Sequence, residues 1–409
     1  MDVDLSVPIL LDGATATNLF ENLVPQDVCV EQWILEHPQK LIDLQKQYAA
    51  IGSQILYAPT FGASTPRLEK FGLADEMERI NRELVALTRS VADNVFVAGV
   101  LSPTGLTLEP FGETSFTEMI HVYREQAAVL VEAGVDLLVV ETLTSIGEAR
   151  AAAIALAKFD LPKIITLTVD KDGETPYGGT AVNALIILQE LGISAFGLNC
   201  SCGPELMVEV LESLKPYAKI PLVAKPSACR YDEDTERLLP ITPIEMAVQM
   251  KRLLAAGATI VGGCCGTTPD HLEAIRDAME EHEFTPFVPA EGEGDITLAD
   301  IRQIYNLYCD QIECTEPLAC SVDMTDELLE LEGESVDVIV VEINTIDDAK
   351  DWACNAHMAN LPVCFYSHDE ISLRLALLLY NGRAMIDSRS SLEEEKLQKI
   401  AEKYGAVIY

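Results

Sequence analysis

The stretch FTEMIHVYREQAAVLVEAGVDLLVVET, residues 116–142, decides the fold. Its first part has apolar residues at helical spacing and ends at Gly134, a typical helix stop. The following run, DLLVVET (136–142), is apolar nearly throughout, as expected for a parallel strand that is covered on both faces. A second such run, KIITLTVD (163–170), follows after another helical segment. The stretch therefore predicts a repeating unit of helix and parallel strand.

The same unit recurs on both sides of this stretch. Six more apolar runs alternate with helix-patterned segments: PILLDGA (8–14), QILYAPTF (54–61), VFVAGVL (95–101), AFGLNC (195–200), LVAKPS (222–227) and TIVGGCC (259–265). Eight units in about 285 residues favour a (β/α)8 TIM barrel over a doubly wound sheet. No GxGxxG or Walker-type loop follows any of the runs, which disfavours nucleotide binding.

A change of composition marks the end of the barrel. We expect the barrel over residues 1–282 and a linker over 283–295, where Pro, Gly and acidic residues gather. Residues 296–409 predict a smaller, half-barrel-like α/β domain. Its apolar runs are LACSVDM (318–324), VDVIVVEIN (336–344), LPVCFYS (361–367), RAMIDSRS (383–390) and GAVIY (405–409).

Composition excludes several classes of partner. The 409 residues include 28 Lys and Arg against 66 Asp and Glu, a net charge of −38 that would repel nucleic acid and anionic membranes. No apolar run approaches the ~18 residues of a membrane span, and no signal peptide is visible. The eleven cysteines lack the spacing of a disulfide framework, so we expect reduced thiols and a cytoplasmic protein.

The active site of a (β/α)8 barrel lies at the carboxyl ends of its strands. The residues at those ends here are Asp12, Thr60, Glu141, Cys200, Cys264 and Cys265. Three thiolates with one open position suit a catalytic zinc ion, and a soft exogenous sulfur suits the fourth position. Zinc lowers the pKa of a bound thiol from about 8.5, so the bound sulfur would be a thiolate at neutral pH.

Other interpretations of the cysteines remain open. A single Cys200 is as readily a small buried hydrophobic residue as a metal ligand. Packing explains the pentapeptide GGCCG (262–266) less well, and a redox role is the next alternative. Cys202 is a further candidate ligand, but its place in a loop favours Cys200.

These motifs resemble the homocysteine S-methyltransferase family over about residues 5–282. The likeness rests on DGATATNLF (12–20), GSQILYAPTFGAS (52–64), AGVLSPTG (98–105), GLNCSCGPE (197–205) and above all GGCCGTTPDH (262–271). The resemblance implies a (β/α)8 barrel and a Zn2+ ion held by Cys200, Cys264 and Cys265. It also implies that Asp12 and Glu141 hold the amino-acid end of homocysteine, as carboxylates suit an ammonium group. It places five further residues at the substrate: Gly13, Ala14, Thr60, Asn199 and Ser227.

Structural roles are the alternative for the two carboxylates. Asp12 could cap the turn before Gly13, and Glu141 could be a buried hydrogen-bonding residue. The sequence also departs from the family. APTF (58–61) stands for TNTF, and PSAC (226–229) stands for PNAG, so Ser227 replaces an Asn near the substrate. These changes leave the acceptor thiol open.

The likeness also bears on the methyl donor. Gly62 stands where the betaine-using branch has a Tyr, and FGAS (61–64) is closer to the first module of cobalamin-dependent methionine synthase. The second unit resembles the first half of a pterin domain through YNGRAMIDS (380–388) and EKYGAVIY (402–409). Because the second half of that domain has no counterpart, we expect this unit to bind protein, either a second copy or a corrinoid carrier, and not methylfolate.

We therefore expect a zinc-dependent enzyme of methionine biosynthesis that transfers a methyl group to homocysteine. The donor is expected to be methylcobalamin carried by a partner protein, with an S-methylmethionine-type sulfonium as the alternative. A non-catalytic metal- or thiol-binding regulatory or assembly subunit is the alternative of a different class.

Overall fold

The computed structural model describes residues 3–20, 27–201, 203–232, 234–235, 237–291, 294–331 and 335–409. Cys202, and Gly292 and Glu293 of the expected linker, lie outside these ranges. The chain forms two compact units, one of Met1–Ala181 with Gly192–Ala290 and one of Val182–Leu191 with Glu291–Tyr409. Within the described part, no helix is long and apolar enough to cross a membrane.

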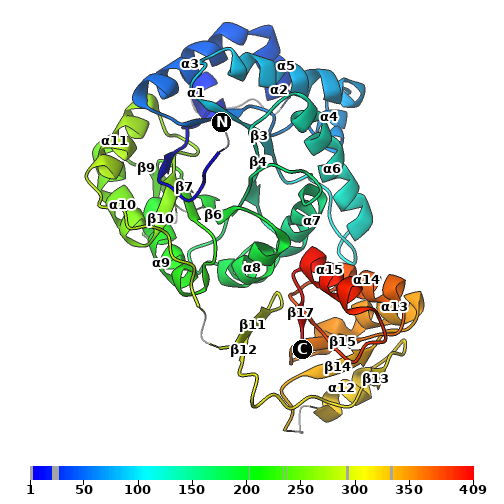
Figure 1. Ribbon diagram of the computed structural model, residues 1–409. Coiled ribbons are helices and arrows are strands. Elements are labelled where there is room, and N and C mark those ends of the chain that lie inside the picture. The colour runs from blue at the N-terminus through cyan, green and yellow to red at the C-terminus, as the bar shows by residue number, and fades with distance from the viewer. Residues whose placement is uncertain are drawn as a thin grey trace. The chain divides into compact units, whose positions relative to one another are not determined.

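The first unit is built on one parallel sheet of eight strands (Figure 1). Neighbouring strands follow the order β1 (Ile9–Leu10), β10 (Ala258–Val261), β7 (Leu222–Pro226), β6 (Ala195–Cys200), β5 (Lys163–Leu167), β4 (Leu137–Leu143), β3 (Phe96–Leu101) and β2 (Ile55–Ala58). Gln54 joins the first strand to the last, because its backbone N–H donates to Leu10 O at 2.8 Å and its Oε1 accepts from Leu10 N at 2.9 Å. The predicted TIM barrel is confirmed.

Helices cover the outside of this sheet (Figure 1). The main ones are α3 (Pro38–Ile51), α5 (Met77–Arg89), α6 (Phe116–Glu132), α7 (Ile146–Leu156), α9 (Pro204–Leu214), α10 (Pro243–Ala255) and α11 (Pro269–Glu280). Capping boxes begin three of them: Ser115 with Glu118 for α6, Thr242 with Glu245 for α10, and Thr268 with His271 for α11. Each box satisfies backbone N–H groups that the first helical turn leaves free. The caps therefore fix where these helices begin, after the loops that follow the carboxyl ends of the strands.

The barrel interior is packed with apolar side chains. Ile9, Tyr57, Val100, Val139 and Ile260 belong to one buried cluster inside the sheet. Because side chains alternate along each strand, these inward residues fill the barrel, while the alternate residues face the helices. The polar residues at the strand ends are thereby held on a rigid platform.

The second unit contains a five-stranded parallel sheet. Its strands follow the order β13 (Leu318–Ala319), β14 (Ile339–Glu342), β15 (Val363–Tyr366), β16 (Met385–Ile386) and β17 (Val407–Ile408), as the apolar runs predicted. Between them lie α12 (Thr325–Leu331), α13 (Ile346–Asn355), α14 (Glu370–Leu379) and α15 (Glu394–Tyr404). Val338, Val340, Cys364 and Met385 form its core.

Two antiparallel hairpins were not predicted from the sequence. They are β8 (Cys229–Asp232) with β9 (Arg237–Pro240), and β11 (Ile296–Ala299) with β12 (Ile304–Leu307). The residues of β8 and β9 are half-buried or exposed, and polar and apolar residues are mixed in both strands. They therefore lack the continuous apolar pattern that marks the barrel strands.

Candidate thiol and metal site

A cavity of about 470 Å³ opens at the carboxyl ends of the barrel strands. Its wall includes Asp12 after β1, Glu141 in β4, Cys200 at the end of β6, Lys225 in β7 and Cys264 after β10. Residues far apart in the sequence thus meet in one place, because parallel strands present their carboxyl ends to the same side.

Three cysteine sulfurs gather in this cavity. The Sγ atoms of Cys200, Cys264 and Cys265 all lie within 4.8 Å of one another, and Cys200 Sγ is 3.7 Å from Cys265 Sγ. Two sulfurs on one tetrahedral zinc ion, with Zn–S bonds of about 2.3 Å, are about 3.8 Å apart. The spacing therefore fits a shared metal ion. Elsewhere in the described chain, no other three Cys, His, Asp or Glu residues form such a group.

The backbone around the cysteines is unusual. Cys200, Ser201 and Thr142 have φ of 60°, 56° and 65°, and no other described non-glycine residue has a positive φ. Such conformations cost free energy and persist where the surroundings impose them, often at functional sites. On the other side of the site Gly262 allows close approach, since a Cβ there would lie 2.7 Å from Leu11 Cβ. Gly262 thus lets the chain before Cys264 pass close to the end of β1, beside Asp12.

By themselves, the three thiols do not ionise readily. Hydrogen bonding with Cys200 is the largest of the effects that raise the pKa of Cys264 to about 12, and burial adds to them. Three adjacent thiolates would repel one another, so a bound cation is required to make all three ionise near neutral pH. The donor set and its electrostatics therefore fit zinc.

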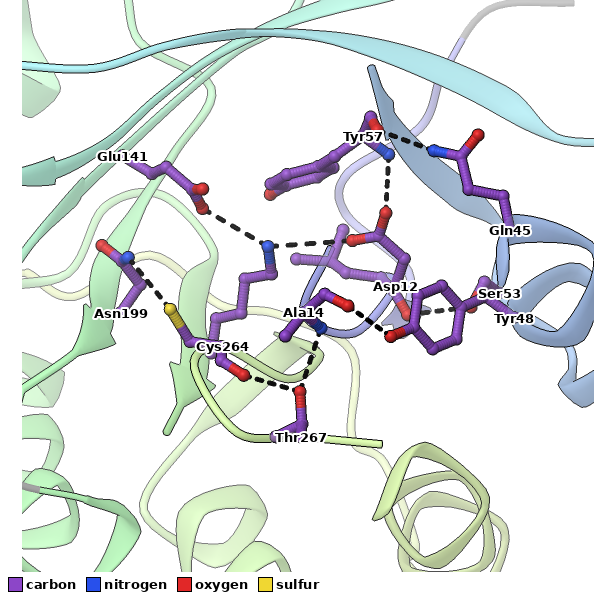
Figure 2. Close-up of polar contacts among 12 residues, drawn as sticks. Asp12, Ala14, Gln45, Tyr48, Ser53, Tyr57, Glu141, Asn199, Cys264 and Thr267 are labelled. Carbon is purple, nitrogen blue, oxygen red and sulfur yellow. Dashed lines mark hydrogen bonds and ion pairs between the residues drawn. The ribbon is translucent and has the colours of Figure 1, made fainter. Parts of the chain in front are cut away.

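A buried charge cluster lies beside the cysteines. Lys225 Nζ is 3.4 Å from Glu141 Oε2, 3.7 Å from Asp12 Oδ1 and 3.8 Å from the centroid of the Tyr57 ring. Asp12 Oδ2 accepts a hydrogen bond from Tyr57 N at 2.8 Å. Glu141 and Asp12 face each other across this cluster (Figure 2).

Burial and charge set the protonation of the cluster. Burial is the main cause that raises the pKa of Asp12 to about 6, although Lys225 opposes it. Burial alone would lower the pKa of Lys225, but Glu141 and Asp12 outweigh it and raise that pKa. Lys225 is therefore a permanent cation between two carboxylates.

Two predicted substrate residues, Gly13 and Ala14, also line the cavity. Tyr48 OH donates to Ala14 O at 2.6 Å, and Ala14 N donates to Thr267 Oγ1 at 3.0 Å (Figure 2). A Cβ on Gly13 would lie 2.9 Å from Tyr48 OH, so this position leaves little room for a side chain. Thr267 Oγ1 also donates to Cys264 O at 2.6 Å, which links the Asp12 loop to the cysteine loop.

The other predicted substrate residues, Thr60, Asn199 and Ser227, do not border the cavity. Thr60 Oγ1 donates to Val100 O at 2.7 Å. Asn199 accepts from Thr142 N at 2.8 Å and donates to Cys264 Sγ at 3.7 Å, while Ser227 Oγ donates to Cys200 Sγ at 3.4 Å. Asn199 and Ser227 thus contact the cysteines directly, and contact of any of the three with substrate stays a prediction.

Three polar residues of the cavity wall that sequence reasoning missed are Glu31, Tyr57 and Lys225. Glu31 is buried, and its Oε1 accepts from Gly62 N at 2.7 Å. The signal for Lys225 was a lone lysine inside the otherwise apolar run LVAKPS, since buried lysines are rare unless paired. Tyr57 and Glu31 carried no comparable signal.

Comparison with known proteins identifies the family. The model of the homocysteine S-methyltransferase family matches residues 9–279. The methionine synthase of Mycobacterium leprae is 29% identical over 289 residues, and that of Mycobacterium tuberculosis is 28% identical over the same length. Each match covers 66% of this chain but 24% of the relative, so the chain matches about a quarter of the length of these relatives.

The fold is shared with a solved structure. The metallated form of the homocysteine methyltransferase MmuM from Escherichia coli aligns with a TM-score of 0.57 at 23% identity, covering 66% of this chain and 96% of that one. The barrel, its cysteine cluster and the family match over residues 9–279 agree. The chain belongs to the homocysteine S-methyltransferase family, a family of methyl-transferring enzymes.

Proposed function

We propose that this protein transfers a methyl group to the sulfur of homocysteine, giving methionine, at a zinc ion held by Cys200, Cys264 and Cys265. The observation that carries the proposal is the convergence of three sulfurs within 4.8 Å on the wall of the cavity. Membership of the family supports the acceptor, and the donor set supports the metal.

When bound, zinc supplies Lewis acidity that keeps a coordinated substrate sulfur as the thiolate at neutral pH. The chain's own residues do the rest. With Cys200, Cys264 and Cys265 as ligands, a zinc ion would keep one position for the substrate sulfur, and Glu141 and Asp12 supply negative charge for the substrate's ammonium group. After the thiol proton has left to solvent, a sulfur lone pair forms the new S–CH3 bond while the bond from methyl to the donor breaks and its electron pair stays with the donor.

For the donor we propose a methylcorrinoid carried by a partner protein. Support comes from the relatives named methionine synthase and from the space around Gly62. A Cβ on Gly62 would lie 2.5 Å from Glu31 Oε1, so the larger side chain of the betaine-using branch would have to displace the Glu31 carboxylate that accepts from Gly62 N. A small sulfonium such as S-methylmethionine is the second candidate, since the buried Glu31 carboxylate borders the same cavity. The second unit is proposed to bind protein, a second copy or the corrinoid carrier.

The test uses purified, zinc-loaded protein with homocysteine and either methylcobalamin or S-methylmethionine, and methionine is measured by mass spectrometry. We expect methionine with methylcobalamin, and chelation of the metal should abolish it. Methionine from S-methylmethionine alone would overturn the corrinoid assignment. Binding of zinc and homocysteine without turnover of either donor would favour a regulatory or assembly subunit.

A further inference from the structure

The charge cluster in the cavity is incompletely paired. The two Lys225–carboxylate distances, 3.4 and 3.7 Å, exceed the 2.7–2.9 Å typical of a charge-assisted N–H···O bond. Asp12 Oδ1 and Tyr57 OH are buried and have no hydrogen-bond partner. Since buried polar atoms are normally paired, these open positions indicate that a ligand completes the cluster.

We propose that Lys225 binds the carboxylate of an amino-acid thiol, while Asp12 Oδ1 and Glu141 bind its ammonium group. This inference rests on the proposed function and names a specificity residue for it. Lys225, Asp12, Tyr57 and Glu141 all line the cavity that contains Cys264, so one small ligand can reach the cluster and the sulfurs. Two acceptor carboxylates and one donor ammonium are complementary to a zwitterion.

A different role for Lys225 is conceivable from its position alone. Its ammonium could take the place of the substrate ammonium, and the site would then accept a thiol acid without an amino group. Charge disfavours this. With Asp12 and Glu141 ionised and Lys225 protonated, the cluster has one net negative charge; a ligand with only a carboxylate raises this to two in a buried site. A zwitterionic ligand adds no net charge to the cluster.

The experiment is a calorimetric titration of the zinc-loaded full chain with three ligands. They are L-homocysteine, 3-aminopropanethiol, which lacks the carboxylate, and 4-mercaptobutyrate, which lacks the ammonium. We expect homocysteine to bind best and 4-mercaptobutyrate worst. Lys225→Met should weaken homocysteine binding about 10- to 100-fold, as expected for losing a hydrogen bond between charged groups, and should not weaken binding of 3-aminopropanethiol.

The exposed Lys251, which pairs with Glu281, provides the matched control Lys251→Met, with no change expected for any ligand. Equal homocysteine affinity with and without Lys225 would overturn the lysine's role and leave the proposed function intact. Tighter binding of 4-mercaptobutyrate than of homocysteine would show that Lys225 replaces the substrate ammonium. If the wild type binds none of the thiols, the proposed function itself fails.

If the Lys225→Met variant is unfolded at the assay temperature, the three ligand titrations of the wild-type protein test the proposal instead. A homocysteine affinity that does not exceed that of 3-aminopropanethiol overturns the inference, because the carboxylate then contributes nothing. A clear preference for homocysteine, together with intermediate loss in Lys225→Gln, which keeps a donor without the charge, supports it.

Discussion

The two parallel sheets of this protein differ in how the polar residues at their strand ends are paired by hydrogen bonds. In the second unit these residues pair with close neighbours: buried Asp387 binds Arg389 Nη2 at 2.6 Å, and Glu342 Oε1 accepts from Asn344 Nδ2 at 2.7 Å. In the barrel, Asp12 Oδ1 lies at a strand end buried and without a hydrogen bond.

The buried unpaired atoms sharpen this contrast. Among the described residues of the second unit, Trp352 Nε1 is the one buried side-chain polar atom without a hydrogen-bond partner, and it lies in helix α13. Of the buried unpaired side-chain atoms in the barrel unit, Asp12 Oδ1 and Tyr57 OH belong to the cavity wall, whereas others, such as Gln45 Oε1 and Thr88 Oγ1, lie in the surrounding helices. Unpaired buried groups cost free energy, so the two in the cavity wall indicate a place that a ligand completes.

The largest effect is expected from replacing cysteines of the barrel, compared with replacing cysteines of the second unit. Replacing both Cys264 and Cys265 with Ser should abolish zinc retention and thiol methylation, because one thiolate cannot hold the metal. The matched change is Cys320→Ser together with Cys354→Ser in the second unit, where Cys320 follows β13. It should leave zinc content and activity unchanged. Metal analysis of both purified variants checks this, and zinc retained by the first would show that the site is misassigned.

The next effect concerns the buried Asp12. Its pKa is about 6 in the fold, above its ordinary value, so its ionisation destabilises the folded state as pH rises from about 4 to above 6. Asp12→Asn removes that titration. Relative to the wild type, the variant should gain up to about 3 kcal/mol of unfolding free energy between pH 4 and pH 7. Denaturant unfolding of the reduced, metal-free proteins measures it, and a difference that stays constant or reverses would contradict the burial argument.

A smaller effect, on homocysteine affinity, is expected from changing a glutamate in β4 but not from changing one in β14. Glu141→Gln should weaken homocysteine binding by about 1.5–3 kcal/mol, through loss of a charge-assisted contact to the ammonium group. Zinc content should not change. Glu342 ends β14 in the second unit, and Glu342→Gln should leave the affinity for homocysteine unchanged. If calorimetry finds equal affinities for wild type and Glu141→Gln, Glu141 is a structural hydrogen-bonding residue.

No effect at all is expected from methylfolate. The carboxylate-rich second unit has only scattered basic residues to attract a polyglutamate tail. Titration of the full chain with methyltetrahydrofolate should show no binding, and sedimentation should show self-association or association with a corrinoid carrier. Micromolar folate binding would contradict this prediction.

Much of the fold was predictable because its strands are buried on both faces. Runs such as DLLVVET are then apolar throughout, and each predicted run contains a strand. Strands β8 and β9, whose residues are half-buried or exposed, have no such pattern. Burial, and not strand propensity, made the difference.

The site was predictable to the extent that it sits at strand ends. Position alone brought Cys200, Cys264 and Glu141 onto one list, and the structure places them around one cavity. It could not show that Asn199 and Ser227 contact cysteine sulfurs, because hydrogen bonds between distant loops leave no local pattern. Lys225 was missed for a related reason, since its partners follow or lie within other strands.

The most direct test of the central claim is zinc K-edge X-ray absorption of the purified protein before and after homocysteine is added. The account predicts one zinc per chain, with three sulfur ligands from Cys200, Cys264 and Cys265 and a fourth sulfur when homocysteine binds. A zinc shell without three sulfurs, or one that gains no sulfur on saturation with homocysteine, would contradict it.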